Sequence, residues 1–133
     1  MEHLQDMLGS HPHQPSAMEA IRRCIAACFD CEQVCTTCAD ACLAEQDIAA
    51  MVHCIRLDLD CADICGATGR IISRLTKPSG VMTEAALEAC ILACGACADE
   101  CRQHAGMHAH FRICAEACDE CAKACRALLD AMA

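Results

Sequence analysis

The stretch from residue 24 to residue 42, CIAACFDCEQVCTTCADAC, decides the fold because it repeats cysteine at helical spacing. Its six cysteines are separated by 4, 3, 4, 3 and 4 residues, which is the spacing of the inward-facing positions of packed helices. Those positions normally carry leucine or isoleucine. A chain that fills them with thiols places soft metal ligands where a protein keeps its core.

The same pattern returns at 90–101 and 114–125, and in thinned form at 54–65, where Asp58 occupies one cysteine slot. We therefore predict four helices that each direct cysteines inward. A chain of 133 residues is the length of one domain. Because short connections between long helices favour antiparallel neighbours, the expected fold is all-α, an antiparallel up-down-up-down four-helix bundle with a cysteine-lined core.

Capping residues predict where the helices begin. Ser16 and Glu19 form a capping box for the first helix. Asp47 and Thr83 are the expected N-caps of the second and third helices. The expected helices span about residues 16–44, 47–75, 83–106 and 107–129.

The bundle domain is expected to span residues 16–133, with residues 1–15 as a separate N-terminal segment. Apolar residues near its start predict a short extra helix, and the alternative is a flexible arm whose histidines have surface roles. The segment has no basic region, apolar core or cleavage site of an export signal, and we expect no membrane-length apolar run after it. A cytoplasmic location follows as an expectation.

Charge excludes two classes of partner. The chain has 10 basic and 19 acidic residues, for a formal net charge of −9 that is spread along its length. Nucleic acid and anionic membrane surfaces attract the opposite balance, so neither is an expected partner.

Disulfides do not explain the cysteines. Cβ atoms at i and i+4 of a helix lie about 5–6 Å apart, whereas a disulfide requires about 3.8 Å. The total of 17 cysteines is also odd. We therefore expect free thiols.

A purely structural use of so many thiols is disfavoured. One buried cysteine packs as a small hydrophobe, but leucine or isoleucine would stabilise a seam better, because each buried methylene contributes about 0.8 kcal/mol. Thiolate selects Cu(I), Zn(II) or iron–sulfur clusters. The chain lacks the loop motif that binds iron–sulfur clusters. A zinc ion held by four thiolates leaves a net charge of about −2 at each buried site. About one Cu(I) for each thiolate leaves the core nearly neutral.

The predicted topology gives the bundle two different ends. Loops 44–47 and 102–108 must lie at the same end, which then collects the exchangeable ligands Met51, His53, His104, Met107, His108 and His110. The opposite end is expected to be closed by Ile21, Ile72, Leu75, Leu87, Leu128 and Met132. Imidazole and thioether both suit copper, so His104, His110 and Met51 are candidate ligands at the open end.

Three cysteine runs carry a family resemblance, namely C24-x3-C28-x2-C31-x3-C35-x2-C38-x3-C42, C90-x3-C94-x2-C97-x3-C101 and C114-x3-C118-x2-C121-x3-C125. With these runs the chain resembles the cytosolic copper storage proteins of bacteria over about residues 16–130. The resemblance implies a homotetramer of bundles, multiple Cu(I) ions and reversible loading at the His/Met-lined end. It also implies that the cysteines are the copper ligands, namely Cys24, Cys28, Cys31, Cys35, Cys38, Cys42, Cys54, Cys61, Cys65, Cys90, Cys94, Cys97, Cys101, Cys114, Cys118, Cys121 and Cys125. Asp58 departs from the pattern, because a carboxylate is a poor ligand for Cu(I).

A second apolar stripe on the second predicted helix, formed by Ile48, Val52, Ile55 and Leu59, is the expected oligomer surface. The resulting hypothesis is a non-enzymatic store and buffer of Cu(I), with a copper donor or acceptor protein as a partner. Two alternatives stay open at this stage. One is a general metal-detoxifying thiol protein for zinc or cadmium, and the other is an iron–sulfur electron-transfer bundle.

Overall fold

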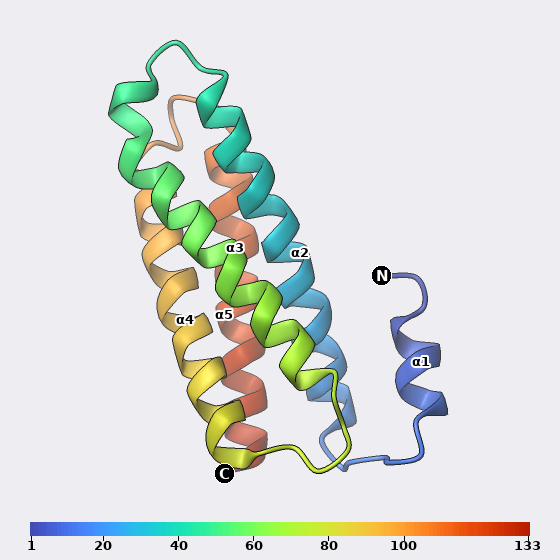
Figure 1. The fold of residues 1–133 in the computed structure, drawn as a ribbon. Coiled ribbons are helices and arrows are strands. Elements are labelled where there is room, and N and C mark those ends of the chain that lie inside the picture. The colour runs from blue at the N-terminus through green and yellow to red at the C-terminus, as the bar shows by residue number, and fades with distance from the viewer.

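A computed structural model describes residues 1–133, and all of its regular secondary structure is helical. Four long helices form an antiparallel bundle, preceded by one short helix that lies beside α2 (Figure 1). The helices are α1 (Leu4–Ser10), α2 (Met18–Leu43), α3 (Val52–Ile72), α4 (Gly80–Gln103) and α5 (Ala109–Met132), and a 3-10 helix (Ile48–Met51) leads into α3. The predicted up-down-up-down bundle and its extra N-terminal helix are confirmed.

Each long helix packs against two neighbours, so that α2 contacts α3 and α5, and α4 contacts the same two helices. The cysteine seams of all four therefore face one axis. Every cysteine is at most 2% exposed, and the thiols form one continuous core cluster with a few larger side chains. Among these larger side chains, Ile25, Met51, Leu87 and Phe111 are fully buried.

The predicted capping box is wrong. The helix begins at Met18 and makes no side-chain cap, because the chain first forms a turn in which the Met18 amide donates to the Pro15 carbonyl at 3.2 Å. Ser16 lies within that turn. Glu19 pairs instead with Arg22 at 2.6 Å, one turn along the exposed face of the helix.

The other two predicted N-caps are also wrong. Asp47 precedes the 3-10 helix without a side-chain cap bond, and its carboxylate faces His108 at 3.4 Å. The cap of α4 is Ser79, whose hydroxyl accepts from the Met82 amide at 3.3 Å. Thr83 lies inside the first turn, where its hydroxyl donates to the Ser79 carbonyl at 2.8 Å. The helix starts earlier because serine already provides a favourable cap.

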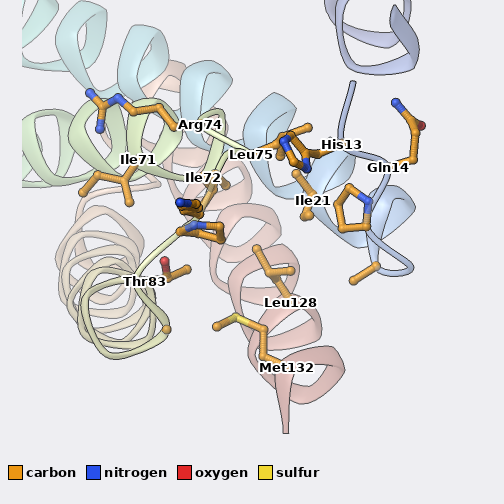
Figure 2. Close-up of a pocket in the computed structure, with 15 residues that line it drawn as sticks. His13, Gln14, Ile21, Ile71, Ile72, Arg74, Leu75, Thr83, Leu128 and Met132 are labelled. Atoms are coloured by element: carbon orange, nitrogen blue, oxygen red, sulfur yellow. The ribbon is translucent and has the colours of Figure 1, made fainter. Parts of the chain in front are cut away.

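The two ends of the bundle differ as expected. The connections α2–α3 and α4–α5 lie together at one end, and the α3–α4 connection lies with the C-terminus at the other (Figure 1). Ile72, Leu75, Leu87 and Leu128 are buried near this second end. This end is hollowed, however, by a cavity of about 530 Å³ that lies beside the segment between α1 and α2, around His13 (Figure 2).

We expected no apolar segment long enough to span a membrane, and one helix contradicts this expectation. By length and composition α4 could cross a membrane, with a mean hydropathy of 1.6 over its most apolar window. The cysteines of the seam and the alanines along the helix account for much of that value. In the structure α4 packs between α3 and α5 and directs its four cysteines into the core.

Two glycines on α3 lie where that helix packs against α2. A Cβ added at Gly69 would lie 2.9 Å from two ring carbons of Phe29. At Gly66 the nearest atom would be a carboxylate oxygen of Glu32, the free end of a flexible side chain. The close approach of the two helices therefore depends on Gly69 more than on Gly66.

We predict that Gly69→Ala lowers the melting temperature of the metal-free protein, because overpacking costs about 1–3 kcal/mol and outweighs a helix-propensity gain of about 1 kcal/mol. Gly66→Ala is the matched control and is expected to keep or raise it, because the Glu32 carboxylate can rotate away. Thermal unfolding followed by circular dichroism measures both. A Gly69→Ala variant more stable than Gly66→Ala would contradict this packing argument.

Candidate metal centre

The thiols of the bundle lie close together but are not bonded. Across helices, the Sγ atoms of Cys35 and Cys118 are 3.6 Å apart, as are those of Cys65 and Cys94. Along one helix, Cys31 and Cys35 are 3.7 Å apart. A disulfide requires about 2.05 Å, and all 17 cysteines are free thiols.

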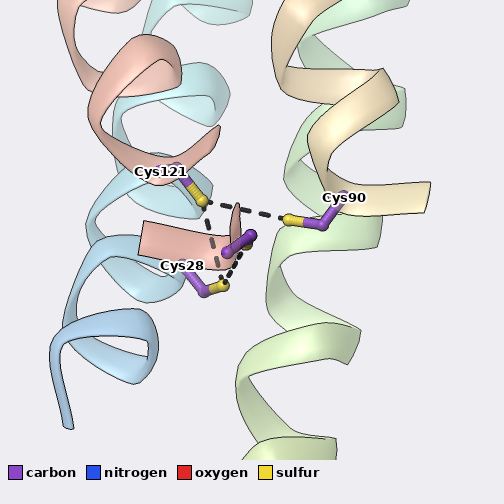
Figure 3. A group of neighbouring side chains, drawn as sticks. Cys28, Cys90 and Cys121 are labelled. Carbon is purple, nitrogen blue, oxygen red and sulfur yellow. Dashed lines mark hydrogen bonds between the residues drawn. The ribbon is translucent and has the colours of Figure 1, made fainter. Parts of the chain in front are cut away.

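The thiols group into sets of four that could each hold a metal ion. Figure 3 shows part of one set, in which Cys28, Cys90 and Cys121 point toward one another from α2, α4 and α5. Within each set the four ligand atoms all lie within 4.8 Å of one another. Five of the sets are Cys28–Cys90–Cys121–Cys125, Cys31–Cys65–Cys94–Cys121, Cys31–Cys35–Cys61–Cys118, Cys35–Cys97–Cys114–Cys118 and Cys38–Asp58–Cys101–Cys114.

Consecutive sets share thiols. The first and second sets share Cys121, and the second and third share Cys31. The third and fourth share Cys35 and Cys118, and the fourth and fifth share Cys114. A shared thiolate can bridge two metal ions, so an ion can pass from one set to the next by exchanging one ligand at a time. The seam therefore forms a connected series of soft sites along the bundle axis.

Asp58 lies inside this series as a neutral acid. Its side chain is fully buried, and its Oδ1 accepts from the thiols of Cys97 at 3.0 Å and Cys114 at 3.3 Å. Burial above all, with the neighbouring thiols adding to it, raises the pKa of Asp58 to about 11. Its Oδ2 is buried without a hydrogen-bond partner. The core thus holds no charged carboxylate at neutral pH.

Burial favours the protonated form of the thiols, although hydrogen bonds with Cys125 and Cys28 outweigh it at Cys24 and lower the pKa of that thiol to about 5. Burial raises the pKa of Cys42 to about 12, and the nearby Cys54 and Asp58 add to the effect. A metal ion that binds as a thiolate complex must therefore displace protons from the core. This donor set of neutral, buried, closely spaced sulfur atoms fits a soft cation of low charge.

The open end brings histidine against sulfur. His110 Nδ1 lies 3.3 Å from the Sγ of Cys38, which makes it a direct continuation of the thiol series. His104 Nδ1 lies 3.4 Å from the Sδ of Met107. His108 stacks on His110, with ring centroids 5.6 Å apart and planes inclined by 6°.

Two other residues predicted at the open end lie in the α2–α3 connection and the first turn of α3, and they differ in exposure. Met51 is fully buried and belongs to the hydrophobic core, whereas His53 is exposed on α3. Sequence reasoning also missed two acids beside the histidines. Glu100 contacts His104, a pair that its i, i+4 spacing could have revealed. Glu45 contacts His108 across two loops, and no local pattern indicates such a contact.

We predict that Asp58→Asn makes the stability of the metal-free protein less dependent on pH. Between about pH 3.9, where the unfolded carboxyl releases its proton, and about pH 11, only the folded state keeps that proton. Wild-type stability should therefore fall as pH rises, by up to about 1.4 kcal/mol per pH unit from this group.

Urea unfolding of reduced protein between pH 5 and pH 7.5 measures the difference in slope between the two proteins. Asp63→Asn is the matched control, because Asp63 is exposed on the same helix. It should keep the wild-type slope. Equal slopes for wild type and Asp58→Asn would show that Asp58 is not held neutral by the core.

Comparison with known proteins agrees with this site. The chain is 49% identical to a copper storage protein of Streptomyces lividans whose structure was solved with 10 copper equivalents, with a TM-score of 0.93 over 96% of this chain and 98% of that chain. A structure of a cytosolic copper storage protein from the same organism with five coppers is 54% identical, with a TM-score of 0.83 over 84% of this chain and 93% of that one.

A cysteine-rich protein of Bacillus subtilis, YhjQ, whose function is uncharacterised, is 39% identical over 105 residues, which is 79% of this chain and 92% of that protein. The model of the copper storage protein family matches residues 17–130, which include all 17 cysteines of the thiol series. The chain belongs to the copper storage protein family.

Proposed function

We propose that this protein stores and buffers many Cu(I) ions in the cytoplasm and has no catalytic role. The observation that carries the proposal is the connected series of shared-thiol sets along a closed bundle axis. A single tight site would need only one such set. A series in which neighbouring sets share ligands provides capacity and a route for ions between sites.

Charge favours Cu(I) over the divalent alternatives. Each Cu(I) that displaces one thiol proton leaves the charge of the core unchanged, so no buried counter-ion is needed. A tetrathiolate zinc site leaves a net charge of about −2, and charge buried without a partner is costly. Several four-cysteine sets match the composition of a zinc site, but zinc ions that share bridging thiolates would still leave a net negative charge in the core.

We also propose that loading occurs at the histidine end and that the ions are exchanged there with a donor or acceptor protein. His110 beside Cys38 connects the solvent-facing loops to the thiol series. At the opposite end, buried aliphatic side chains such as Leu87 and Leu128 offer no metal ligand. Relatives described as loaded with five or ten coppers support a multi-ion capacity.

Titration of the reduced protein with Cu(I) in the presence of a competing chelator tests the proposed cargo. We expect saturation on the order of one ion per thiolate, far tighter for Cu(I) than for Zn(II), because soft, low-charge ions suit a neutral thiol core. Replacing Cys35 and Cys118, which two sets share, by serine should lower the number of ions bound. Saturation at a few ions, or tighter binding of zinc, would refute copper storage.

We propose that the bundle assembles as a homotetramer through the outer face of α3. Val52 and Leu59 are 60% and 45% exposed there, and Ile48 before them is 38% exposed. Together with Ile55 they form an apolar stripe that a monomer would leave in water. Burying such a stripe against another copy removes it from solvent.

A Val52→Glu/Leu59→Glu double variant is expected to shift the protein to a smaller oligomer, because charges would be buried in the contact. Light scattering coupled to size-exclusion chromatography gives the molar mass. Ala127→Glu adds a charge to an exposed position of α5 and should leave the mass unchanged. A wild-type protein that is monomeric, or a double variant that keeps the wild-type mass, would contradict the assignment of this face.

A further inference from the structure

Two acid–histidine–sulfur lines lie at the open end of the bundle. In the first, Glu100 Oε2 lies 2.8 Å from the Nε2 of His104, whose Nδ1 lies 3.4 Å from the Sδ of Met107. In the second, Glu45 Oε1 lies 3.4 Å from the Nε2 of His110 as an ion-pair contact without a hydrogen bond, and the Nδ1 of His110 lies 3.3 Å from the Sγ of Cys38. Both rings have the same orientation, with Nε2 toward an acid and Nδ1 toward sulfur.

This arrangement selects the ligand atom of each ring. A carboxylate only accepts hydrogen bonds, and a neutral imidazole has one N–H and one bare nitrogen. The hydrogen bond between Glu100 and Nε2 of His104 therefore favours the tautomer with hydrogen on Nε2 and a free lone pair on Nδ1. At His110 the negative charge of Glu45, 3.4 Å from Nε2, favours the same tautomer by electrostatic attraction. Acids that hold the far nitrogen of a metal-binding histidine also fix the orientation of its ring.

We propose that Glu100 and Glu45 are positioning residues that set up two successive nitrogen–sulfur landing sites for incoming Cu(I). The inference rests on the proposed storage function. His104 and Met107 form the outer site, and Met107 is 46% exposed. His110 and Cys38 form the inner site, where Cys38 already belongs to the outermost four-residue set.

The two sites differ in a way that drives ions inward. The outer site has two neutral donors, imidazole and thioether, whereas the inner site includes a thiol that can become an anionic thiolate. When Cu(I) reaches the inner site, a copper–sulfur bond forms, the S–H bond of Cys38 breaks and one proton leaves. No electron is transferred. An anionic sulfur binds Cu(I) more tightly, so transfer from outer to inner site is favoured.

Glu45 has a second contact that holds the inner site in place. Its other oxygen, Oε2, lies 3.2 Å from the Nε2 of His108, and His108 stacks on His110. One carboxylate at the end of α2 therefore spans two histidines at the start of α5. Glu45 fixes the loop end of α2 relative to α5, next to the point where Cys38 receives the ion.

Nitrogen-15 NMR of the reduced, metal-free protein tests the tautomers directly. We expect His104 and His110 to have hydrogen on Nε2, and Glu100→Ala and Glu45→Ala to produce mixed tautomers at His104 and His110, respectively. Stopped-flow transfer of Cu(I) from a coloured chelator should then be about tenfold slower in each variant, as is typical when such partners are removed. The number of ions finally bound should not change.

Glu88→Ala removes the same charge from the exposed face of α4 and is the control, expected to match wild type in both measurements. Glu100→Gln, which keeps an accepting oxygen, should recover much of the loading rate. Wild-type tautomers and rates in both alanine variants would overturn the positioning role while leaving copper storage intact. If wild type itself failed to bind Cu(I), the storage proposal would fall, and the NMR measurement would still decide the tautomers.

Discussion

Close packing of thiol against thiol along the bundle axis is the contact on which the rest of the structure depends. Sulfur atoms from four helices lie 3.6 to 4.0 Å apart in pairs such as Cys35–Cys118 and Cys28–Cys125. Cysteine is small, so the helices can approach closely, and the core has no need of large side chains at most seam positions. The same contacts place sets of neighbouring thiols within reach of one metal ion.

Neutrality is the second constraint on this core. Seventeen buried thiolates without metal would be strongly destabilising, and burial keeps groups such as Cys42 protonated. Asp58 is neutral for the same reason. Exchange of a proton for a singly charged ion preserves this balance at every step, so the fold need not change as the core fills. The bundle is accordingly expected to form before metal arrives.

Periodicity in the sequence was sufficient to predict the bundle, its topology and the location of the thiols. It also placed Asp58 in a cysteine slot, and the structure finds it buried among thiols. The predictions failed where the outcome depends on local competition between turns. Ser79 caps α4 in place of Thr83 because an earlier cap was available, and Ser16 is occupied in a turn.

The open end shows the other limit of sequence reasoning. Topology brought His104 and His110 to one end, but it could not tell which nitrogen of each ring faces sulfur. That depends on Glu45 and Glu100, and the Glu45 contact joins residues more than 60 positions apart. Met51 lies at that end as expected, but its full burial depends on the 3-10 helix, which the sequence pattern did not predict. Such details follow from packing in three dimensions.

Native mass spectrometry of the reduced protein during Cu(I) loading tests the central claim most directly, because each mass step counts both copper gained and protons lost. A neutral, shared-thiol core predicts one proton lost for each copper bound through most of the loading, in a folded protein with an unchanged distribution of charge states. Loss of two protons for each copper throughout would mean that charge accumulates in the core. That result would contradict the account.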